Sequence, residues 1–479
     1  MEIKQPEFLK LVIVAKKKID KVDLLLSKLD KTQLTDFIKK ECSDNRQFKD
    51  RFLALGAGTL FKPDPTKYAS RVESLMEEYS DRHGYIYYSD TFAFNRAVTK
   101  ILGEADEAME KEHWDVAVAV LTGIASVAED IINSGDDSAG ELGAIVSDCF
   151  EKWHELCFEE NLPESIKSEI FELALSRFNQ KDLKGWDWWW DWMQMSIDLA
   201  DTPEKQNRVF KALDAIRPNG DDWSSRFAFN TAQNYRLELM SKCGSLEDQI
   251  QFMYDNVSNS DFRKRLIQIA WDKGDYEEVL RLATDGVGQD SEYAGLVSEW
   301  QKWQYKVYSE TGDKDNQLQL AKHFFFKGGC FGDKVFSMEA MYKVLKSLIP
   351  QNEWSKYTED LINEALGNGD VYSLLFIYTI ERKWPEYMEY LRQNPSIYNI
   401  DDAPQEVKKH FRDEIIVLYS SAVNRFFQRA TDRKSYREGV DLLRNLIKYG
   451  GTKEAQQIVA EQKSRTPRRP ALIDELSKL

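Results

Sequence analysis

RKRLIQIAWDKGDYEEVLRLATDG, residues 263–286, is the stretch of sequence that decides the fold. Its apolar residues between Leu266 and Trp271 are spaced as on one side of a helix, and Gly274 is typical of a helix C-terminus. Asp275 and Glu278 have the spacing of a capping box, in which two side chains bond the first turn of a new helix. The stretch therefore predicts two helices joined by a tight turn.

A helical hairpin of this size buries too little apolar surface to be stable by itself, so it has to stack on neighbouring hairpins. Turns of the same kind recur from residue 203 to residue 391, but their irregular spacing fits no fixed repeat length. The predicted fold class is therefore all-α, an irregular α-solenoid of stacked helical hairpins similar to TPR or HEAT arrays.

The composition of the 479 residues also favours helices over strands. Proline (12) and glycine (24) are sparse, and charged residues make up 30% of the chain. The segment nearest to a strand is DVAVAVL, residues 115–121, in which valine and alanine alternate. Apolar residues continue from it at steps of three and four up to Ile131, so we predict one buried helix of roughly five turns.

Prolines and charge divide the chain into three predicted segments. Residues 1–62 are an N-terminal helical segment, whose short helices we expect to begin at Thr32 and at Ser43 or Asp44. The linker Lys62-Pro63-Asp64-Pro65 ends it, because a residue before proline disfavours the helix. Residues 63–404 are an acidic helical-repeat body, and residues 405–479 are a basic C-terminal helical segment continuous with the body.

The net charge of −16 is unevenly distributed. Residues 405–479 contain 16 Lys and Arg against 10 Asp and Glu, a charge of +6, which leaves −22 on the first 404 residues. The acidic body argues against general nucleic-acid affinity, because a phosphate backbone would be repelled. Within the basic segment, Arg465, Arg468 and Arg469 are candidate polyanion contacts, and the alternative is a solvated helix surface.

The segment KGWDWWWDW, residues 184–192, contains five of the thirteen tryptophans. On a helix, Trp186, Trp189 and Trp190 would lie on one broad side and Trp188 and Trp192 on another, so one neighbouring element could not cover all five. We favour burial between layers. The alternative is an exposed groove in which Trp186, Trp189 and Trp190 bind a ligand or a partner.

Other polar clusters are better explained by structure than by chemistry. Asp136, Asp137, Ser138 and Glu141 precede an apolar run and are expected to cap a helix, since their spacing does not fit a calcium loop. Cys149, His154 and Cys157 lack a fourth zinc ligand and are expected to be packed inside. The glycine-rich residues 328–334 are expected to form a turn, because the lysine is misplaced for a phosphate loop.

The sequence indicates no catalytic centre, cofactor, metal or membrane segment. The motifs GxSxG, HExxH and GxxxxGK[ST] are absent, and no apolar run approaches the ~20 residues that span a bilayer. Residues 9–15 are a short apolar run that the basic cluster follows, unlike a signal peptide. Five scattered cysteines suit a reducing compartment, so we expect a cytoplasmic protein.

Five segments carry a family resemblance, in the same order along the chain. They are LLLSKLDKTQLTDFIKKECSDNRQF at 24–48, HGYIYY at 83–88, DDSAGELG at 136–143, YKVLKSLIPQNEW at 342–354 and RTPRRPALIDELSKL at 465–479. Together they resemble the long helical region of bacterial SWIM-type zinc finger proteins. The CxCxnCxH finger of that family is missing, because no CxC occurs here. The resemblance implies the helical region alone and an interaction role.

Three functions remain as hypotheses. The first is a non-catalytic protein-interaction scaffold on a helical-repeat surface, which binds one or more proteins. The second is a nucleic-acid-associated factor that uses the basic C-terminal quarter. The third is a small-ligand protein or enzyme that uses the aromatic cluster Trp186–Trp192.

Overall fold

The computed structural model describes residues 21–26, 28–60, 63–218, 223–327 and 333–479. Within these ranges the chain folds into helices and contains no β-strand, which confirms the all-α prediction. The chain forms two compact units, residues 1–259 (unit 1) and 260–479 (unit 2), and each is described by itself. The segment boundaries expected at residues 62 and 404 stay predictions.

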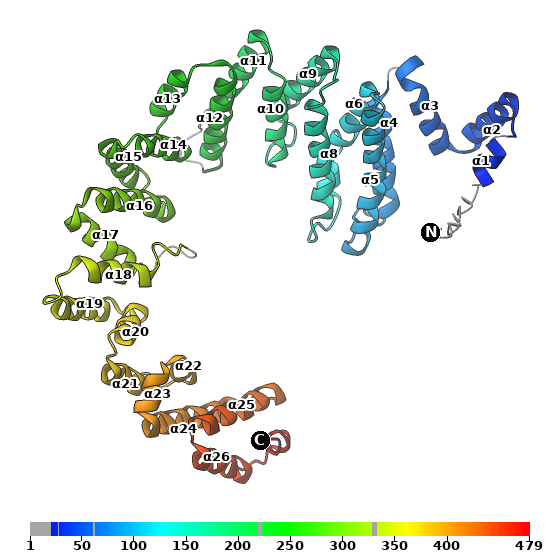
Figure 1. Cartoon of the computed structure of the whole chain (residues 1–479). Helices are drawn as coiled ribbons and strands as arrows, with labels where there is room; N and C mark the ends of the chain where they lie inside the picture. Colours follow the sequence, from blue (N-terminus) through cyan, green and yellow to red (C-terminus); the bar gives the residue numbers. More distant parts are fainter. Residues whose placement is uncertain (1–20, 27, 61–62, 219–222, 328–332) are drawn as a thin grey trace, which may run out of the picture. The chain divides into compact units, whose positions relative to one another are not determined.

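Unit 1 contains the helices in the first half of the chain (Figure 1). Their bounds are α1 Lys21–Leu26, α2 Lys31–Asp44, α3 Arg46–Leu60, α4 Pro65–Tyr79, α5 Tyr88–Glu110, α6 Trp114–Ala125, α7 Ala128–Asn133, α8 Glu141–Cys157, α9 Glu164–Gln180, α10 Trp188–Asp198, α11 Pro203–Asp214, α12 Trp223–Cys243 and α13 Leu246–Asp255.

Helix α6 lies at the centre of the N-terminal half of unit 1. Its sequence WDVAVAVLTGIA is apolar on every side, and all of its residues except Asp115 and Thr122 are buried. It packs against α4, α5 and α8, which lie beside it in Figure 1. A helix without a polar side is stable only when neighbours cover it all round. The prediction of a buried helix in place of a strand is therefore confirmed.

The predicted helix is nevertheless too long, because the chain breaks after Ala125. Ser126 and Val127 separate α6 from the short helix α7, and the Ser126 hydroxyl donates to the carbonyl of Gly123. Such a local side-chain bond competes with the backbone bonds that would continue the helix. The apolar spacing up to Ile131 thus predicted correctly that these residues are buried, but the prediction of one continuous helix was wrong.

Two expected N-caps in the N-terminal segment are wrong by one or two residues. The cap of α2 is Asp30, not Thr32, since Asp30 and Gln33 form a reciprocal capping box with bonds of 2.8 and 3.1 Å. Ahead of α3, the Asn45 side chain accepts from the Phe48 amide at 3.0 Å, in place of Ser43 or Asp44. In the expected linker, Asp64 caps α4, which begins at Pro65, while residue 62 lies outside the described residues.

Unit 2 continues with helices of similar length. Their bounds are α14 Ser260–Asp272, α15 Tyr276–Gln289, α16 Ala294–Thr311, α17 Lys314–Phe326, α18 Met338–Leu348, α19 Trp354–Asn368, α20 Val371–Ile380, α21 Trp384–Gln393, α22 Ile397–Asp402, α23 Gln405–His410, α24 Arg412–Arg429, α25 Arg433–Tyr449, α26 Thr452–Ser464 and α27 Pro470–Leu476.

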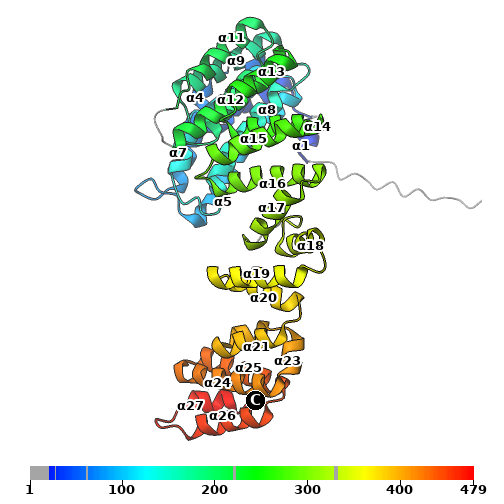
Figure 2. The ribbon, with the colours of Figure 1, turned by 90° about the vertical axis from the view of Figure 1, so that its left-hand side faces the viewer.

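The hairpin predicted from residues 263–286 is the first of this unit. Gly274 adopts a left-handed conformation with φ of 73°, and the Asp275 carboxylate accepts from the Glu278 amide at 3.1 Å to begin α15. The packing then passes from each helix to the next, from α14 through α18 and again from α19 to α21. The C-terminal helices α24, α25, α26 and α27 pack together around a shared apolar core (Figure 2).

Across the described ranges, no helix combines the length and the apolar content that crossing a membrane requires.

Candidate functional site

The tryptophan segment is a loop followed by a helix, and not the single helix that the spacing argument assumed. Helix α10 begins at Trp188, so Trp186 precedes it. In the loop between α9 and α10, Lys181, Leu183 and Gly185 have φ angles of 63°, 60° and 111°. Such left-handed residues reverse the chain too sharply for a helix to pass through. The expected common helix side of Trp186, Trp189 and Trp190 is therefore wrong for Trp186.

The structure buries three of these tryptophans and exposes one. Trp189, Trp190 and Trp192 are buried, whereas Trp186 is 41% exposed. Trp189 stacks on Phe178 with a ring separation of 4.7 Å, and its Nε1 donates to the Phe178 carbonyl at 3.0 Å. The favoured expectation of packing between layers thus holds for the helix, because α10 packs against α8, α9, α11 and α12.

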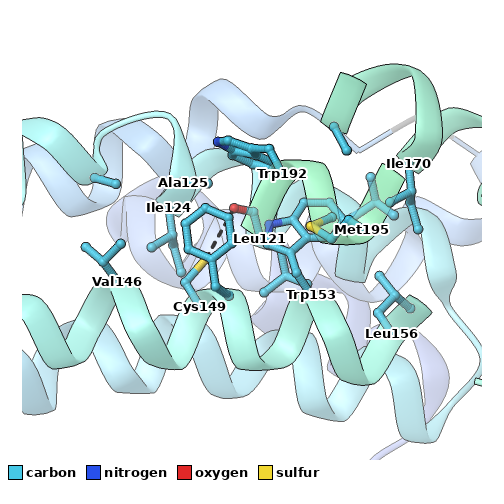
Figure 3. Packing of buried hydrophobic residues seen from close by; sticks show 14 of the residues in the cluster. Leu121, Ile124, Ala125, Val146, Cys149, Trp153, Leu156, Ile170, Trp192 and Met195 are labelled. Atoms are coloured by element: carbon cyan, nitrogen blue, oxygen red, sulfur yellow. Dashed lines mark hydrogen bonds between the residues drawn. The ribbon is translucent and has the colours of Figure 1, made fainter. Parts of the chain in front are cut away.

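Trp192 and the two cysteines of α8 belong to the apolar core. Figure 3 shows Trp192 beside Trp153 and Cys149, and its ring lies 6.4 Å from that of Trp153. Burial raises the pKa of the Cys149 and Cys157 thiols to about 12, so neither is a thiolate at neutral pH. Both cysteines are packed inside, as expected. His154 is different, because its Nε2 lies 3.2 Å from a carboxylate oxygen of Asp191.

A cavity of about 480 Å³ lies beside Trp189 and has a cationic lining. Lys181 and Lys184 come from the loop after α9, and Arg217 follows α11. Ser224, in the first turn of α12, is one of the neutral polar residues that also line it. None of the described residues that line the cavity is a carboxylate. We call these four residues with Trp189 the cationic cavity.

Sequence reasoning identified Trp189 but missed the three cations of the cationic cavity. Lys181 and Arg217 are 36 residues apart in the sequence. All three basic side chains are exposed, and none differs in its local sequence from other surface lysines and arginines. Only the packing of α9, α10, α11 and α12 brings them together. No local spacing in the sequence could have indicated this.

The C-terminal arginines divide into structural and exposed ones. Arg469 donates from Nη1 to the carbonyls of Phe427 and Ala430, at 3.1 and 3.2 Å, and so binds the C-terminal end of α24. Arg465 lies 3.5 Å from the Gln462 side chain and is exposed, and Arg468 is exposed as well. The three candidates therefore lie close in the chain but do not have the same environment.

The polar loop before α8 is a capping structure, as expected. Asp137 accepts from the amides of Leu142 and Gly143 at 2.7 and 3.2 Å, which satisfies two donors in the first turn of α8. Asp136 accepts from the amide of Ser138 at 2.9 Å. Of the glycine-rich residues 328–334, residues 328–332 lie outside the described residues, so the turn expected there stays a prediction.

The connection between α4 and α5, together with the first turns of α5, presents four aromatic rings to solvent: Tyr85 and Tyr87 precede α5, and Tyr88 and Phe92 lie on it. Tyr85, Tyr87, Tyr88 and Phe92 are between 42% and 55% exposed, while Ile86 between them is fully buried. We call these four residues the aromatic turn. In the sequence, residues 83–88 stood out only as a segment of the family resemblance, and nothing in the pattern distinguished exposed rings from core rings.

No protein-family model, curated protein or solved structure matches this chain. Within the described ranges, no group of three or more His, Cys, Asp or Glu side chains is arranged to hold a metal ion. The geometry of the aromatic turn and of the cationic cavity therefore carries the functional argument.

Proposed function

We propose that this chain is a non-catalytic protein-interaction scaffold, built as an irregular α-solenoid, and that a partner protein binds at its aromatic turn. The successive packing of α14 through α18 supports the solenoid, because repeat arrays make most of their contacts between adjacent units. The resemblance to the helical region of SWIM-type zinc finger proteins agrees with such a role. The odd number of scattered cysteines suits the cytoplasm as its location.

The observation that carries the proposal is that the aromatic turn is both exposed and rigid. The Asp81 carboxylate accepts from the amides of His83 and Tyr85 at 2.8 and 3.1 Å, and from the Tyr87 hydroxyl at 3.3 Å. On the other side, Ile86 exchanges backbone bonds of 2.8 and 3.0 Å with Ser134 and Asp136. The chain that presents the rings is therefore fixed before any partner arrives.

Rigid aromatic residues are suited to protein recognition for two physical reasons. Each ring buries a large area while losing few rotatable bonds, so the entropic cost of binding is low. Tyrosine also offers a hydroxyl that remains hydrogen-bonded at an interface. Tyr85 and Tyr87 lie edge to face at 5.3 Å, and Tyr88 and Phe92 do so at 5.9 Å. Grouped exposed rings of this kind mark interaction surfaces in soluble proteins.

The test is affinity purification of the tagged full-length protein from its native cells, with nuclease, at low and high salt, read by quantitative mass spectrometry. The variant Tyr88→Ser/Phe92→Ser removes two exposed rings. The control Tyr372→Ser/Tyr398→Ser removes two rings that are 82% and 72% exposed in unit 2. We expect a stoichiometric protein partner with the unchanged protein and the control, and its loss with the first variant.

Two outcomes would contradict the proposal. A stoichiometric partner that binds both variants equally would place the interaction away from the aromatic turn. Recovery of nucleic acid alone, lost with nuclease or salt, would replace the scaffold by the factor that uses the basic C-terminal quarter. Thermal unfolding of both variants confirms that neither has lost its fold.

A further inference from the structure

The lining of the cationic cavity is positively charged, although it belongs to the part of the chain with a large negative net charge. The first 404 residues have a net charge of −22, yet three cations and no carboxylate line this cavity among the described residues. Exposed lysines and arginines in such a chain would be expected to have acidic neighbours. The cavity therefore requires a reason why its positive charge is left uncompensated.

Two aspartates close in the chain to the cations of the cavity form ion pairs elsewhere. Asp182, between Lys181 and Lys184, is 3.1 Å from Arg177 of α9. Asp214, at the end of α11, is 2.5 Å from Arg236 of α12. Both aspartates are thus paired with arginines that do not line the cavity, so neither of the two neutralises its cations.

The loop that supplies the two lysines is held in a fixed conformation. Lys181 and Leu183 adopt left-handed conformations, which cost energy for residues with a side chain and persist only where surrounding contacts impose them. The Leu183 side chain is 1% exposed, so it anchors the loop in the core. Lys181 and Lys184 are therefore placed beside the cavity before a ligand binds, which lowers the cost of binding.

The remaining wall is apolar and aromatic. Trp189 and Phe178 stack on each other, and Ile216 lines the cavity from the end of α11. The Lys184 ammonium lies 5.9 Å from the Trp189 ring, so the charged and the aromatic parts adjoin. A volume of about 480 Å³ is within the range of small-molecule sites. A bare inorganic anion would leave this apolar wall without a partner.

We propose that the cationic cavity binds a small organic phosphate, with its phosphoryl group at Lys181, Lys184 and Arg217 and its apolar body against Trp189. Phosphate fits better than carboxylate because a phosphate monoester carries between one and two negative charges and three acceptor oxygens. The hydroxyl of Ser224 adds a donor at the same wall. The site is separate from the aromatic turn, and this inference does not depend on the scaffold proposal.

Isothermal titration calorimetry of the full-length protein with phenyl phosphate tests the inference, because this probe joins a phosphoryl group to one apolar ring. Inorganic phosphate and phenol supply the two halves separately. We expect saturable binding of phenyl phosphate. Inorganic phosphate and phenol should each bind at least about tenfold more weakly than phenyl phosphate does. Lys184→Gln and Arg217→Gln should each weaken it about tenfold, since each removes a charge-assisted bond.

Lys211→Gln is the matched control, because Lys211 is an exposed lysine on α11 that does not line the cavity. It should change the affinity by less than about twofold, as expected for an exposed lysine outside the lining, whose charge solvent and salt screen. Absence of saturable binding would overturn the inference. If Lys211→Gln weakened the binding of phenyl phosphate as much as the two cavity variants do, the binding would be general electrostatic attraction to the protein, and the inference would be wrong. If inorganic phosphate bound as tightly as phenyl phosphate, the proposed role of the apolar wall would be wrong.

Discussion

Arg263 is a buried arginine that connects three consecutive helices of unit 2. It lies on α14 and is 2% exposed. Its guanidinium donates to the Leu282 carbonyl at 2.8 Å and to the Gln289 side chain at 2.5 Å, both on α15. It also lies 5.8 Å from the ring of Trp300 on α16. A charge in this position is stable only because these partners replace its hydration.

We expect Arg263→Ala to lower the free energy of unfolding of unit 2 by about 3 kcal/mol, because it leaves a cavity and unpaired acceptors. The control is Arg265→Ala on the same helix, where the side chain is exposed, with an expected change below about 0.5 kcal/mol. Urea unfolding followed by circular dichroism measures both. Equal effects of the two substitutions would contradict the structural role of Arg263.

At the scale of elements, the close approach of α4 to α6 depends on one glycine. A Cβ atom at Gly123 would lie 2.5 Å from the Pro65 carbonyl oxygen and 2.6 Å from the Tyr68 Cβ. Backbone and Cβ atoms cannot move aside as the end of a flexible side chain can. Gly123 therefore sets the separation of these two helices.

We expect Gly123→Ala to destabilise unit 1 by about 1–3 kcal/mol, the usual cost of overpacking. Gly103→Ala on α5 is the matched control, since its Cβ would meet nothing within 4 Å. That substitution should be neutral or stabilise by up to about 1 kcal/mol, because alanine is the better helix former. Thermal unfolding that shifts both variants in the same direction would argue against the close contact.

The short terminal helix α27 is held to α25 by a buried carboxylate. Glu475 is 3% exposed, and its oxygens lie 2.8 Å from Lys478 and 3.5 and 3.6 Å from Arg437 and Arg433. The bond from Lys478, followed by the charges of Lys478 and Arg437, holds the pKa of Glu475 below its usual value. Part of the basic charge of the C-terminal quarter is thus used inside the fold.

The stability contributed by Glu475 should depend on pH in a defined direction. A carboxylate whose pKa is lower in the folded than in the unfolded state stabilises fully above the unfolded value of about 4.3. Its contribution is lost as the pH falls through the folded pKa. The stability difference between the unchanged protein and Glu475→Gln should therefore shrink from pH 7 to pH 3.

The control for this pH dependence is Glu438→Gln, at an exposed glutamate of α25. Its difference from the unchanged protein should stay small across the same pH range. Melting temperatures in a series of buffers of constant ionic strength measure both. A constant difference for Glu475→Gln would show that the carboxylate is not charged in its contacts with Lys478 and with the two arginines of α25.

At the scale of elements, the sequence could predict those features that depend on residues within a few helical turns of each other. The helix pair around Gly274 and Asp275, and the buried helix α6, follow from spacing within a few turns, and both are present. The cap of α3 was misplaced because Asn45 follows Ser43 and Asp44, which cap helices equally well. At α2 the prediction chose Thr32 although Asp30, two residues earlier, is the better N-cap residue. From the sequence alone, Arg263 would be expected at the surface. It is buried because Leu282 and Gln289, 19 and 26 residues further along the chain, provide its hydrogen-bond acceptors.

The same limit applies to the candidate sites. Trp189 stands out by composition, but whether it borders a cavity depends on where α11 and α12 lie. Ile86 is buried whereas Tyr88 and Phe92 are exposed, although all three are large apolar residues close together in the chain. Periodicity identifies which residues are apolar, whereas long-range packing decides which of them remain uncovered.

At the scale of the whole molecule, residues 1–259 and 260–479 form two compact units, and each contains hydrophobic clusters of its own. We expect the full-length chain to unfold in two transitions instead of one, as chains with independent cores do. Gly123→Ala should lower the midpoint of one transition only, and Arg263→Ala should lower only the other. Differential scanning calorimetry measures both midpoints. A single transition that both substitutions shift equally would show one cooperative body.

The all-round apolar character of α6 also has a consequence for synthesis of the chain in the cell. Helix α6 leaves the ribosome about 30 residues before α8, one of its covering helices, is complete. At 5–20 residues per second this interval lasts roughly 2 to 6 seconds. During that time WDVAVAVLTGIA is only partly covered, as an apolar segment that chaperones bind and that aggregates if left free. The nascent chain should therefore depend most on chaperones while residues 126–157 emerge from the ribosome.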